Sequence, residues 1–508
     1  MVHCYKNGGY HIVLDVNSGS VHVVDRAVYD MIPVCEKAYE KKCRMHSSGC
    51  EKESCKAGDK EGGRCDGDFS AMREAVFSDT ALQEKYDRKT LEEALSEIEE
   101  LVAQELLFSE DIYEEYVDGF QDRETVVKAL CLNIAHDCNL RCSYCFADEG
   151  QYHGGKRGLM SLEVGKAALD FLIDHSGNRR NLEVDFFGGE PLMNWEVVKN
   201  IVAYGRELEK KNDKRFRFTL TTNGVLLNDE ILEFANREMA NLVLSIDGRR
   251  AVHDRMRPFP GRRGSSYDTI VPKFLKAANS RNQQNYFVRG TFTRYNLDFS
   301  KDVEELANLG FQQISVEPVV AKPEDDYALR EEDLPALFEE YDQLAQFLLK
   351  RHGEGRDFQF FHFDIDLTGG PCVAKRLSGC GSGCEYLGVT PWGELYPCHQ
   401  FAGNRDFVMG NVNDGSGLVR TDIRDEFKLC NVYAKDKCRD CFAKFYCSGG
   451  CAANAYNFKG KINETYDLGC ALQQKRIECS IMIKAAQADM EENYEESVRL
   501  PDAPRAVC

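Results

Sequence analysis

Residues 126–318 alternate strand-like and helix-like patterns, and this alternation limits the chain to few folds. Six apolar runs have the length and composition of buried strands: KALCLNIA, LEVDFFG, RFRFTLTT, LVLSIDG, NYFVRGTFT and QISVEPV. Helices fit between them, most clearly over residues 161–175, where Ser161 can cap the start and Gly177 follows the end. The pattern predicts an α/β fold in which a parallel sheet forms a partial (β/α)6 TIM-type barrel, with a doubly wound open sheet as the alternative.

Different patterns flank this alternation. Residues 10–25 alternate apolar and polar side chains around a turn at 17–19, which predicts a β-hairpin, and helical periodicity covers about 27–42 and 91–106. Beyond about residue 370 the periodicity fades and Cys, Gly and aromatic residues dominate, so that part needs bound metal to be stable. We therefore predict domains at 1–118, 119–370 and 371–508.

A polar, Gly-rich stretch at about 43–70 interrupts the first domain and predicts an inserted mobile loop. Its cysteines have irregular spacing, which leaves a zinc site as the alternative. They are Cys43, Cys50, Cys55 and Cys65.

Composition limits the classes of binding partner and the cellular location that we expect. The chain has 84 acidic and 64 basic residues, a formal charge of -20, which disfavours nucleic acid and anionic membrane surfaces as main partners. It has neither a targeting pattern nor a run of roughly 20 apolar residues, so we expect no membrane span and a cytoplasmic location. Cytosolic thiols stay reduced, so the 22 cysteines predict metal binding or chemistry rather than disulfides. The isolated ones suit packing or surface positions: Cys4, Cys35, Cys131, Cys479 and Cys508.

The segment DCNLRCSYCFADEG, residues 137–150, follows the first barrel strand and has the spacing C-x3-C-x2-C. It offers three thiolates, from Cys138, Cys142 and Cys145. A structural zinc site needs a closed tetrahedron of ligands, whereas a [4Fe-4S] cluster held by three cysteines leaves one iron free to bind a small molecule. The spacing therefore favours an open iron-sulfur cluster.

With Tyr144 before its last cysteine, this motif resembles the signature of the radical S-adenosylmethionine (SAM) enzymes. The resemblance implies that Cys138, Cys142 and Cys145 are catalytic and hold a [4Fe-4S] cluster whose open iron chelates SAM. One electron from that cluster would cleave SAM to methionine and a 5'-deoxyadenosyl radical, which takes hydrogen from unactivated carbon.

Motifs at the ends of later strands resemble the SAM pocket of the same family. Each also has a plainer interpretation as a turn, a cap or a surface ion pair. With Tyr144, the implied SAM-binding residues are Gly188, Gly189, Glu190, Thr222, Asn223, Ser245, Asp247 and Arg257.

The C-terminal cysteines resemble a SPASM domain, which carries two auxiliary [4Fe-4S] clusters. By that resemblance one cluster takes Cys380, Cys398 and Cys451; its fourth ligand is Cys384 or Cys372, or the position is open for a substrate thiolate. The other cluster takes Cys438, Cys441, Cys447 and Cys470. A zinc ribbon is the alternative for this segment.

The N-terminal hairpin unit resembles the winged-helix leader-recognition element of peptide-modifying enzymes, because a hairpin edge can take an extended peptide as an added strand. Residues 8–30 and 379–401 together look most like the SCIFF-peptide maturases, which form thioether crosslinks between Cys sulfur and the α-carbon of another residue. This implies a Cys-rich precursor peptide with a leader as partner, and a one-electron reductant such as a ferredoxin or flavodoxin.

Three other functions stay open. One is formylglycine formation of the anaerobic sulfatase-maturing type, which would use the same clusters. Another is carbon-carbon crosslinking of a peptide. The third is a non-catalytic iron-sulfur electron carrier, against which the open three-cysteine loop and the complete set of six predicted barrel units argue.

Overall fold

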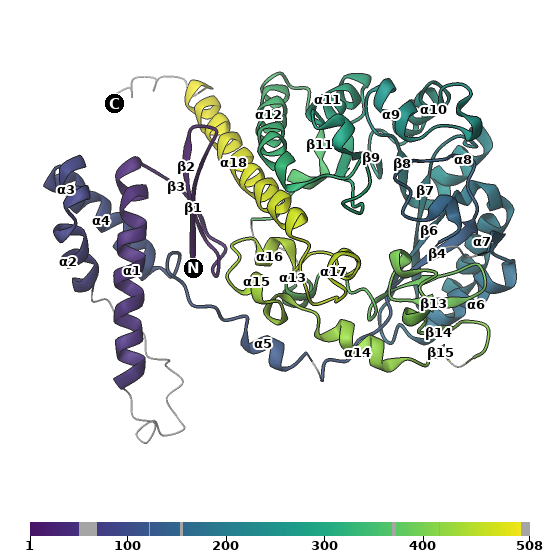
Figure 1. Cartoon of the computed structure of the whole chain (residues 1–508), viewed down its shortest axis with the longest axis horizontal. Coiled ribbons are helices and arrows are strands. Elements are labelled where there is room, and N and C mark those ends of the chain that lie inside the picture. Colours follow the sequence, from purple (N-terminus) through teal and green to yellow (C-terminus); the bar gives the residue numbers. More distant parts are fainter. Residues whose placement is uncertain (50–68, 121, 153–155, 368–371, 416, 499–508) are drawn as a thin grey trace, which may run out of the picture.

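The computed structural model describes residues 1–49, 69–120, 122–152, 156–367, 372–415 and 417–498. An N-terminal sheet with helices lies beside the long C-terminal helix, and the barrel forms the opposite side of the molecule (Figure 1). Across the described residues, no helix combines the length and apolar character needed to cross a membrane. Of the cysteines predicted to lie in an insertion, Cys50, Cys55 and Cys65 fall outside the described residues.

The N-terminal unit is an antiparallel sheet covered by helices. Strands β1 (Val2–Asn7), β2 (Tyr10–Asp15) and β3 (Val21–Val24) pair in that order. The predicted hairpin is β2–β3, and β1 is an additional strand that the sequence pattern did not reveal. The helices are α1 (Arg26–Gly49), α2 (Ser70–Ser78), α3 (Thr80–Lys85) and α4 (Arg88–Ala103). They pack into a small core of their own around Val13, Ile32 and Leu95.

The barrel is built as predicted from parallel strands with helices between them. Within residues 122–152 and 156–367, the six predicted strands pair in parallel in the order of the chain. They are β4 (Ala129–His136), β6 (Asn181–Gly188), β7 (Arg215–Thr222), β8 (Met239–Ser245), β9 (Tyr286–Phe292) and β10 (Gln313–Pro318). The sheet does not close on itself, so the barrel is partial.

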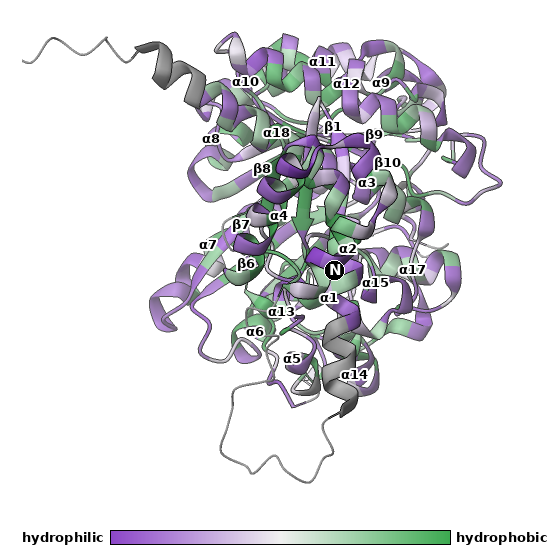
Figure 2. Cartoon of the chain, turned by 90° about the vertical axis from the view of Figure 1, so that its left-hand side faces the viewer, coloured by the Kyte–Doolittle hydropathy of each residue, from purple (hydrophilic) through white to green (hydrophobic). Residues whose placement is uncertain are grey.

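Helices cover one face of this sheet, and its apolar strands lie at the centre of the molecule (Figure 2). They are α6 (Leu162–Asp174), α7 (Trp195–Lys211), α8 (Asp229–Glu238), α9 (Arg250–Met256), α10 (Ser266–Ser280), α11 (Ser300–Leu309) and α12 (Leu334–Gly353). Ser161 caps α6 as predicted, because its side chain accepts the N–H of Val164 at 3.3 Å.

The cysteine-rich C-terminal part continues the barrel sheet. Strand β12 (Tyr386–Val389) pairs in parallel with β4, and β13 (Glu394–Tyr396), β14 (Gly410–Asn411) and β15 (Gly417–Leu418) extend the sheet antiparallel. The neighbouring strands β4 and β12 therefore come from segments about 250 residues apart in the sequence.

The remaining elements are short, with one exception. The exception is α18 (Asp467–Val498), which lies against α12 and beside β1 (Figure 1). The others are β5 (Gly158–Leu159), β11 (Gln359–Phe360), α5 (Glu115–Asp118), α13 (Val373–Ser378), α14 (Thr421–Leu429), α15 (Asp436–Arg439), α16 (Lys444–Cys447) and α17 (Ala452–Lys459). A helix of this length was not expected in a part where periodicity fades.

Candidate active site

The predicted cysteine loop follows β4 directly, at the carboxyl end of the barrel strands. The end of α9 and the residues just after it hold the loop in place: the N–H of Arg141 donates to the carbonyl oxygen of Pro258 at 2.9 Å, and the N–H of Ser143 donates to that of Met256 at 2.8 Å. The loop backbone is therefore anchored on both sides of Cys142.

The thiols of this loop are partly buried and influence one another. Burial, followed by the charges of Glu190 and Cys145, raises the pKa of Cys138 to about 12. Burial raises the pKa of Cys142 as well; the charge of Arg257 opposes this shift, and Cys145 and Cys138 reinforce it. Because metal ligands must be deprotonated, these thiolates need a strongly positive partner between them.

The spacing of the loop fits a cluster better than a single ion. A zinc site would bring its thiolates to about 2.3 Å from one ion. In a cubane each thiolate binds a different iron, so the three sulfurs lie farther apart, and the donor set of the loop suits that arrangement.

Tyr144 ties the loop to the next strands through its hydroxyl group. The hydroxyl donates to both carboxylate oxygens of Asp247 at 2.7 Å. Arg257 Nε donates to the same carboxylate at 2.9 Å, and so does the N–H of Thr291 on β9 at 3.0 Å. The Asp247 carboxylate is fully buried. Through these hydrogen bonds it connects the cysteine loop, β8 and β9.

Gly188 and Gly189 are required by the close approach of two strands. Gly188 has a φ of +123°, and a Cβ there would lie 2.5 Å from the carbonyl oxygen of Ala135. A Cβ on Gly189 would lie 2.1 Å from the carbonyl oxygen of Asp137, next to Cys138. The glycine pair therefore has a structural role, because it lets β6 reach the start of the cysteine loop.

Glu190 joins this turn to the end of β7. Its carboxylate accepts the hydroxyl of Thr222 and the N–H of Asn223, both at 2.8 Å. Burial raises the pKa of Glu190 to about 7, although the N–H groups of Asn223 and Leu192 favour the carboxylate form. Asn223 Nδ2 lies 3.7 Å from Cys138 Sγ, so the Thr-Asn turn reaches the cysteine loop.

Ser245, another predicted SAM-pocket residue, is placed beside this network by its position in the sheet. It ends β8 two residues before Asp247, and its Cα pairs with that of Arg289 on β9. The others form one hydrogen-bonded group with the cysteine loop or adjoin it directly.

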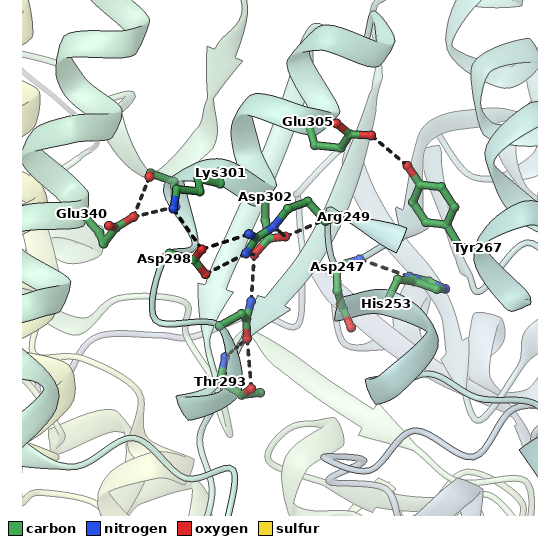
Figure 3. A network of polar contacts seen from close by, with 12 residues as sticks. Asp247, Arg249, His253, Tyr267, Thr293, Asp298, Lys301, Asp302, Glu305 and Glu340 are labelled. Atoms are coloured by element: carbon green, nitrogen blue, oxygen red, sulfur yellow. Dashed lines mark hydrogen bonds and ion pairs between the residues drawn. The ribbon is translucent and has the colours of Figure 1, made fainter. Parts of the chain in front are cut away.

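A second layer behind Asp247 was not predicted from the sequence (Figure 3). Arg249 donates from its backbone N–H and its Nε to Asp302 Oδ1, at 2.9 and 2.8 Å, and from Nη2 to Asp298 at 2.7 Å. Asp302 is fully buried, and its Cβ would lie 2.3 Å from a Cβ on Gly248. The partners lie about 50 residues away in the sequence, so no local pattern could reveal them.

A model of the radical SAM superfamily matches residues 132–276, which include this cysteine loop and its partners on β6, β7 and β8. The chain contains a radical SAM domain.

The chain is similar to other proteins over about two thirds of its length. A cysteine-type anaerobic sulfatase-maturating enzyme of Clostridium novyi is 23% identical over 65% of this chain and 88% of that protein. A PqqA peptide cyclase of Rhodopseudomonas palustris is 25% identical over 68% of this chain and 86% of that protein. Native anSMEcpe with bound AdoMet and Cp18Cys peptide shares the fold, with a TM-score of 0.57 and 19% identity over 71% of this chain and 99% of that chain.

Beyond the radical SAM domain, thiols within each of the two predicted groups of C-terminal cysteines influence one another's pKa. Burial, followed by the charges of Cys451 and Cys380, raises the pKa of Cys398 to about 12. In the second group, burial and then the charges of Cys447 and Cys441 raise the pKa of Cys470 to about 11. Burial and the same neighbouring thiols raise the pKa of Cys438 to about 12. Each group thus has thiols close enough to act on one another.

Cys384 differs from these thiols. It is buried with 4% of its surface exposed, and its Sγ donates to the carbonyl oxygen of Arg424 at 3.2 Å. Cys372 is exposed at the start of α13. Of the isolated cysteines, Cys35, Cys131 and Cys479 are buried, which agrees with a packing role.

Proposed function

We propose that this chain is a radical SAM enzyme that forms thioether crosslinks, from Cys sulfur to an α-carbon, in a Cys-rich precursor peptide. The observation that carries the proposal is the single network that joins the cysteine loop, through Tyr144, to Asp247 and Arg257 on one side and, through Cys138, to Asn223 and Glu190 on the other.

Cys138, Cys142 and Cys145 would hold a [4Fe-4S] cluster that leaves one iron for SAM. When bound, the cluster and SAM supply the radical that takes hydrogen from carbon. Tyr144 and Asp247 fix the loop, and the guanidinium group of Arg257 lies 5.4 Å from the centre of the Tyr144 ring. These contacts hold the loop against β8 and β9, and the Asp247 carboxylate that the loop contacts is buried away from water.

The C-terminal cysteine groups would hold two auxiliary [4Fe-4S] clusters, one at Cys380, Cys398 and Cys451 and the other at Cys438, Cys441, Cys447 and Cys470. The burial of Cys398 in the first group and of Cys438 in the second supports this, because burial disfavours a thiolate that has no positive partner. An iron with a free position at the first cluster would bind and acidify the substrate thiol.

A peptide as substrate is supported by the relatives. One is named a peptide cyclase and another a sulfatase-maturating enzyme, and the solved neighbour holds a peptide together with AdoMet. Within the described residues, β3 pairs with β2 on one side only, and Val23 on it is 50% exposed. This edge would take the leader as an added strand, so hydrogen exchange at residues 21–24 should slow when a precursor peptide binds.

The central test is SAM cleavage by anaerobically reconstituted protein with a strong reductant. We expect deoxyadenosine from the wild type and none from a variant with Cys138, Cys142 and Cys145 changed to Ala, while iron remains at the C-terminal cysteines. Cys4→Ala, which removes a partly buried thiol outside these groups, is the matched control. Deoxyadenosine formation by the triple variant would refute the assignment, and its absence from the wild type would favour an electron carrier.

The product separates thioether formation from formylglycine formation, which the sulfatase-maturating relative keeps as the second candidate. A thioether makes the peptide lighter by one hydrogen pair and removes one alkylatable thiol. Conversion of Cys to formylglycine instead replaces the thiol sulfur with a carbonyl oxygen, which mass spectrometry resolves.

A further inference from the structure

A charged group lies on the open face of the barrel sheet and has no role in the network described above. Along β9 the residues Tyr286, Val288 and Phe292 are buried, whereas Arg289 alternates with them and points to the other face. Glu317 extends from β10 and His362 from the short 3-10 helix Phe361–Phe363. The fourth member is Arg476 of α18.

These side chains bond to one another in a row. Arg289 Nη2 donates to both carboxylate oxygens of Glu317, at 2.8 and 2.7 Å. His362 Nε2 lies 3.1 Å from the hydroxyl of Ser315 and 3.8 Å from Glu317. Arg476 Nη1 donates to His362 Nδ1 at 2.9 Å.

The group has positive charge in excess and unused donors. Burial, followed by the charge of Arg476, lowers the pKa of His362 to about 3, so this histidine is neutral and two guanidinium groups face one carboxylate. Among the described residues, Arg476 Nε is buried without a hydrogen-bond partner. The side chain of Arg289 is 50% exposed, and Phe361 beside the group is 51% exposed. The accessible guanidinium group of Arg289 next to an exposed ring, with the unpaired Nε donor of Arg476 behind it, suits a carboxylate on an apolar stem.

The group adjoins the SAM pocket on one side. Ser245 pairs with Arg289 and Arg289 with Ser315, so these residues form one row across β8, β9 and β10, with neighbouring strands about 4.8 Å apart. Two residues farther along β9, Thr291 donates its N–H to Asp247. On the other side, burial and then the charge of Arg289 lower the pKa of His399, which follows Cys398. Arg289 thus lies between the SAM pocket and the first group of C-terminal cysteines.

We propose that Arg289 and Arg476 form a substrate site that binds a carboxylate of the peptide, and that Glu317 occupies Arg289 until the substrate arrives. This inference rests on the proposed function, because it assumes a peptide substrate. The carboxylate comes from an acidic side chain near the reacting Cys or from a peptide C-terminus. Binding there places the neighbouring residue beside the SAM pocket.

The test measures binding rather than turnover, so its failure is distinct from failure of SAM cleavage. Three probes are titrated into the reconstituted full-length protein with SAM: acetyl-GCEG-amide, acetyl-GCQG-amide, and acetyl-GCQG with a free C-terminal carboxylate. Ligand-observed NMR gives each Kd. We expect one of the two carboxylate probes to bind about tenfold tighter than acetyl-GCQG-amide, and the tighter one identifies the source of the carboxylate.

Variants of Arg289 and Glu317 should change the preference for the carboxylate probe in opposite directions. Arg289→Gln should abolish the preference, and Arg289→Lys should restore part of it because the charge returns without the fork of donors. Glu317→Gln should increase the preference, because the internal competitor is gone. Arg250→Gln, which removes an exposed arginine paired with Asp268 on the outer helices, is the matched control and should keep it. Equal affinity for all three probes, a preference that survives Arg289→Gln, or a weaker preference in Glu317→Gln would each overturn the proposal.

Discussion

The buried carboxylate of Asp302 should be the anchor of the loop that carries Asp247. Asp302 accepts hydrogen bonds from the backbone N–H and the side chain of Arg249, and from Asn296 Nδ2 at 2.9 Å. Asp302→Ala would remove all of them and leave Arg249 with Asp298 alone. None of these residues belongs to the predicted SAM pocket, so the effect on the site would be transmitted through the loop.

The size of the effect follows from the donors that lose their acceptor. A buried donor without a partner costs about 1–3 kcal/mol, and here the N–H of Arg249 and the amide of Asn296 are affected. Part of this is offset, since the buried carboxylate and its desolvation cost also disappear. We expect a net loss of about 3–4 kcal/mol. For a unit of about 250 residues, with an unfolding entropy of about 0.5 kcal/mol/K, Tm falls by about 6–8 °C.

Calorimetry of the reconstituted protein without oxygen measures this loss, with and without SAM. At a SAM concentration of about 100 times Kd, the ligand stabilises the wild type by about 2.7 kcal/mol. If the loop carrying Asp247 shifts, SAM should stabilise Asp302→Ala by less, about 1.4 kcal/mol less for a tenfold loss of affinity.

Asp298→Ala is the matched control, because it removes the more exposed partner of the same arginine. Asp298 is 37% exposed and Arg249 keeps Asp302, so we expect a cost of about 1 kcal/mol. If both variants lower Tm equally, or if SAM stabilises Asp302→Ala as strongly as the wild type, the buried anchor does not position the loop.

Three further predictions concern stability. Burial raises the pKa of Glu190 to about 7, so the contribution of its protonated form to the free energy of unfolding is present below about pH 4.5 and is lost as pH rises through 7. Relative to Glu190→Gln, the wild type should lose about 3 kcal/mol of stability over that window in urea titrations. A difference between the two proteins that does not change with pH would contradict this. Ser161→Ala removes the cap on the Val164 N–H and should cost about 1 kcal/mol in urea unfolding, whereas Ser161→Asp should cost less. Asp111→Asn leaves Lys444, 3% exposed, without its carboxylate partner and should cost about 3 kcal/mol; an unchanged urea midpoint would show that the pair is not needed.

Local patterns predicted the barrel well, because each strand and helix carries its own period. The six strands were found as apolar runs, and Ser161 marked a helix start that the structure confirms. Such signals depend on neighbours within a few residues, which the sequence displays directly.

Helix α18 is a helix that hydrophobic periodicity did not predict. Residues 479–483 on it are all buried, because the helix packs against α12 on one side and the N-terminal sheet on another. A helix covered on several sides has no single apolar stripe, so the pattern that identifies surface helices is missing. Strand β12 was hidden for a different reason: its pairing with β4 joins segments about 250 residues apart.

Sequence alone determined the cysteine loop and its likeness to the SAM-binding motif, because the spacing of three thiols along a few residues already specifies which ligands can meet. It also marked Gly188 and Gly189, although the reason for them, the approach of β6 to Asp137, appeared only in the fold. Tertiary structure decided which residues surround the loop. Asp302 meets Arg249 behind Asp247, and Arg289 meets Glu317 beside the proposed SAM pocket, through strand register and helix packing, which depend on contacts between distant segments.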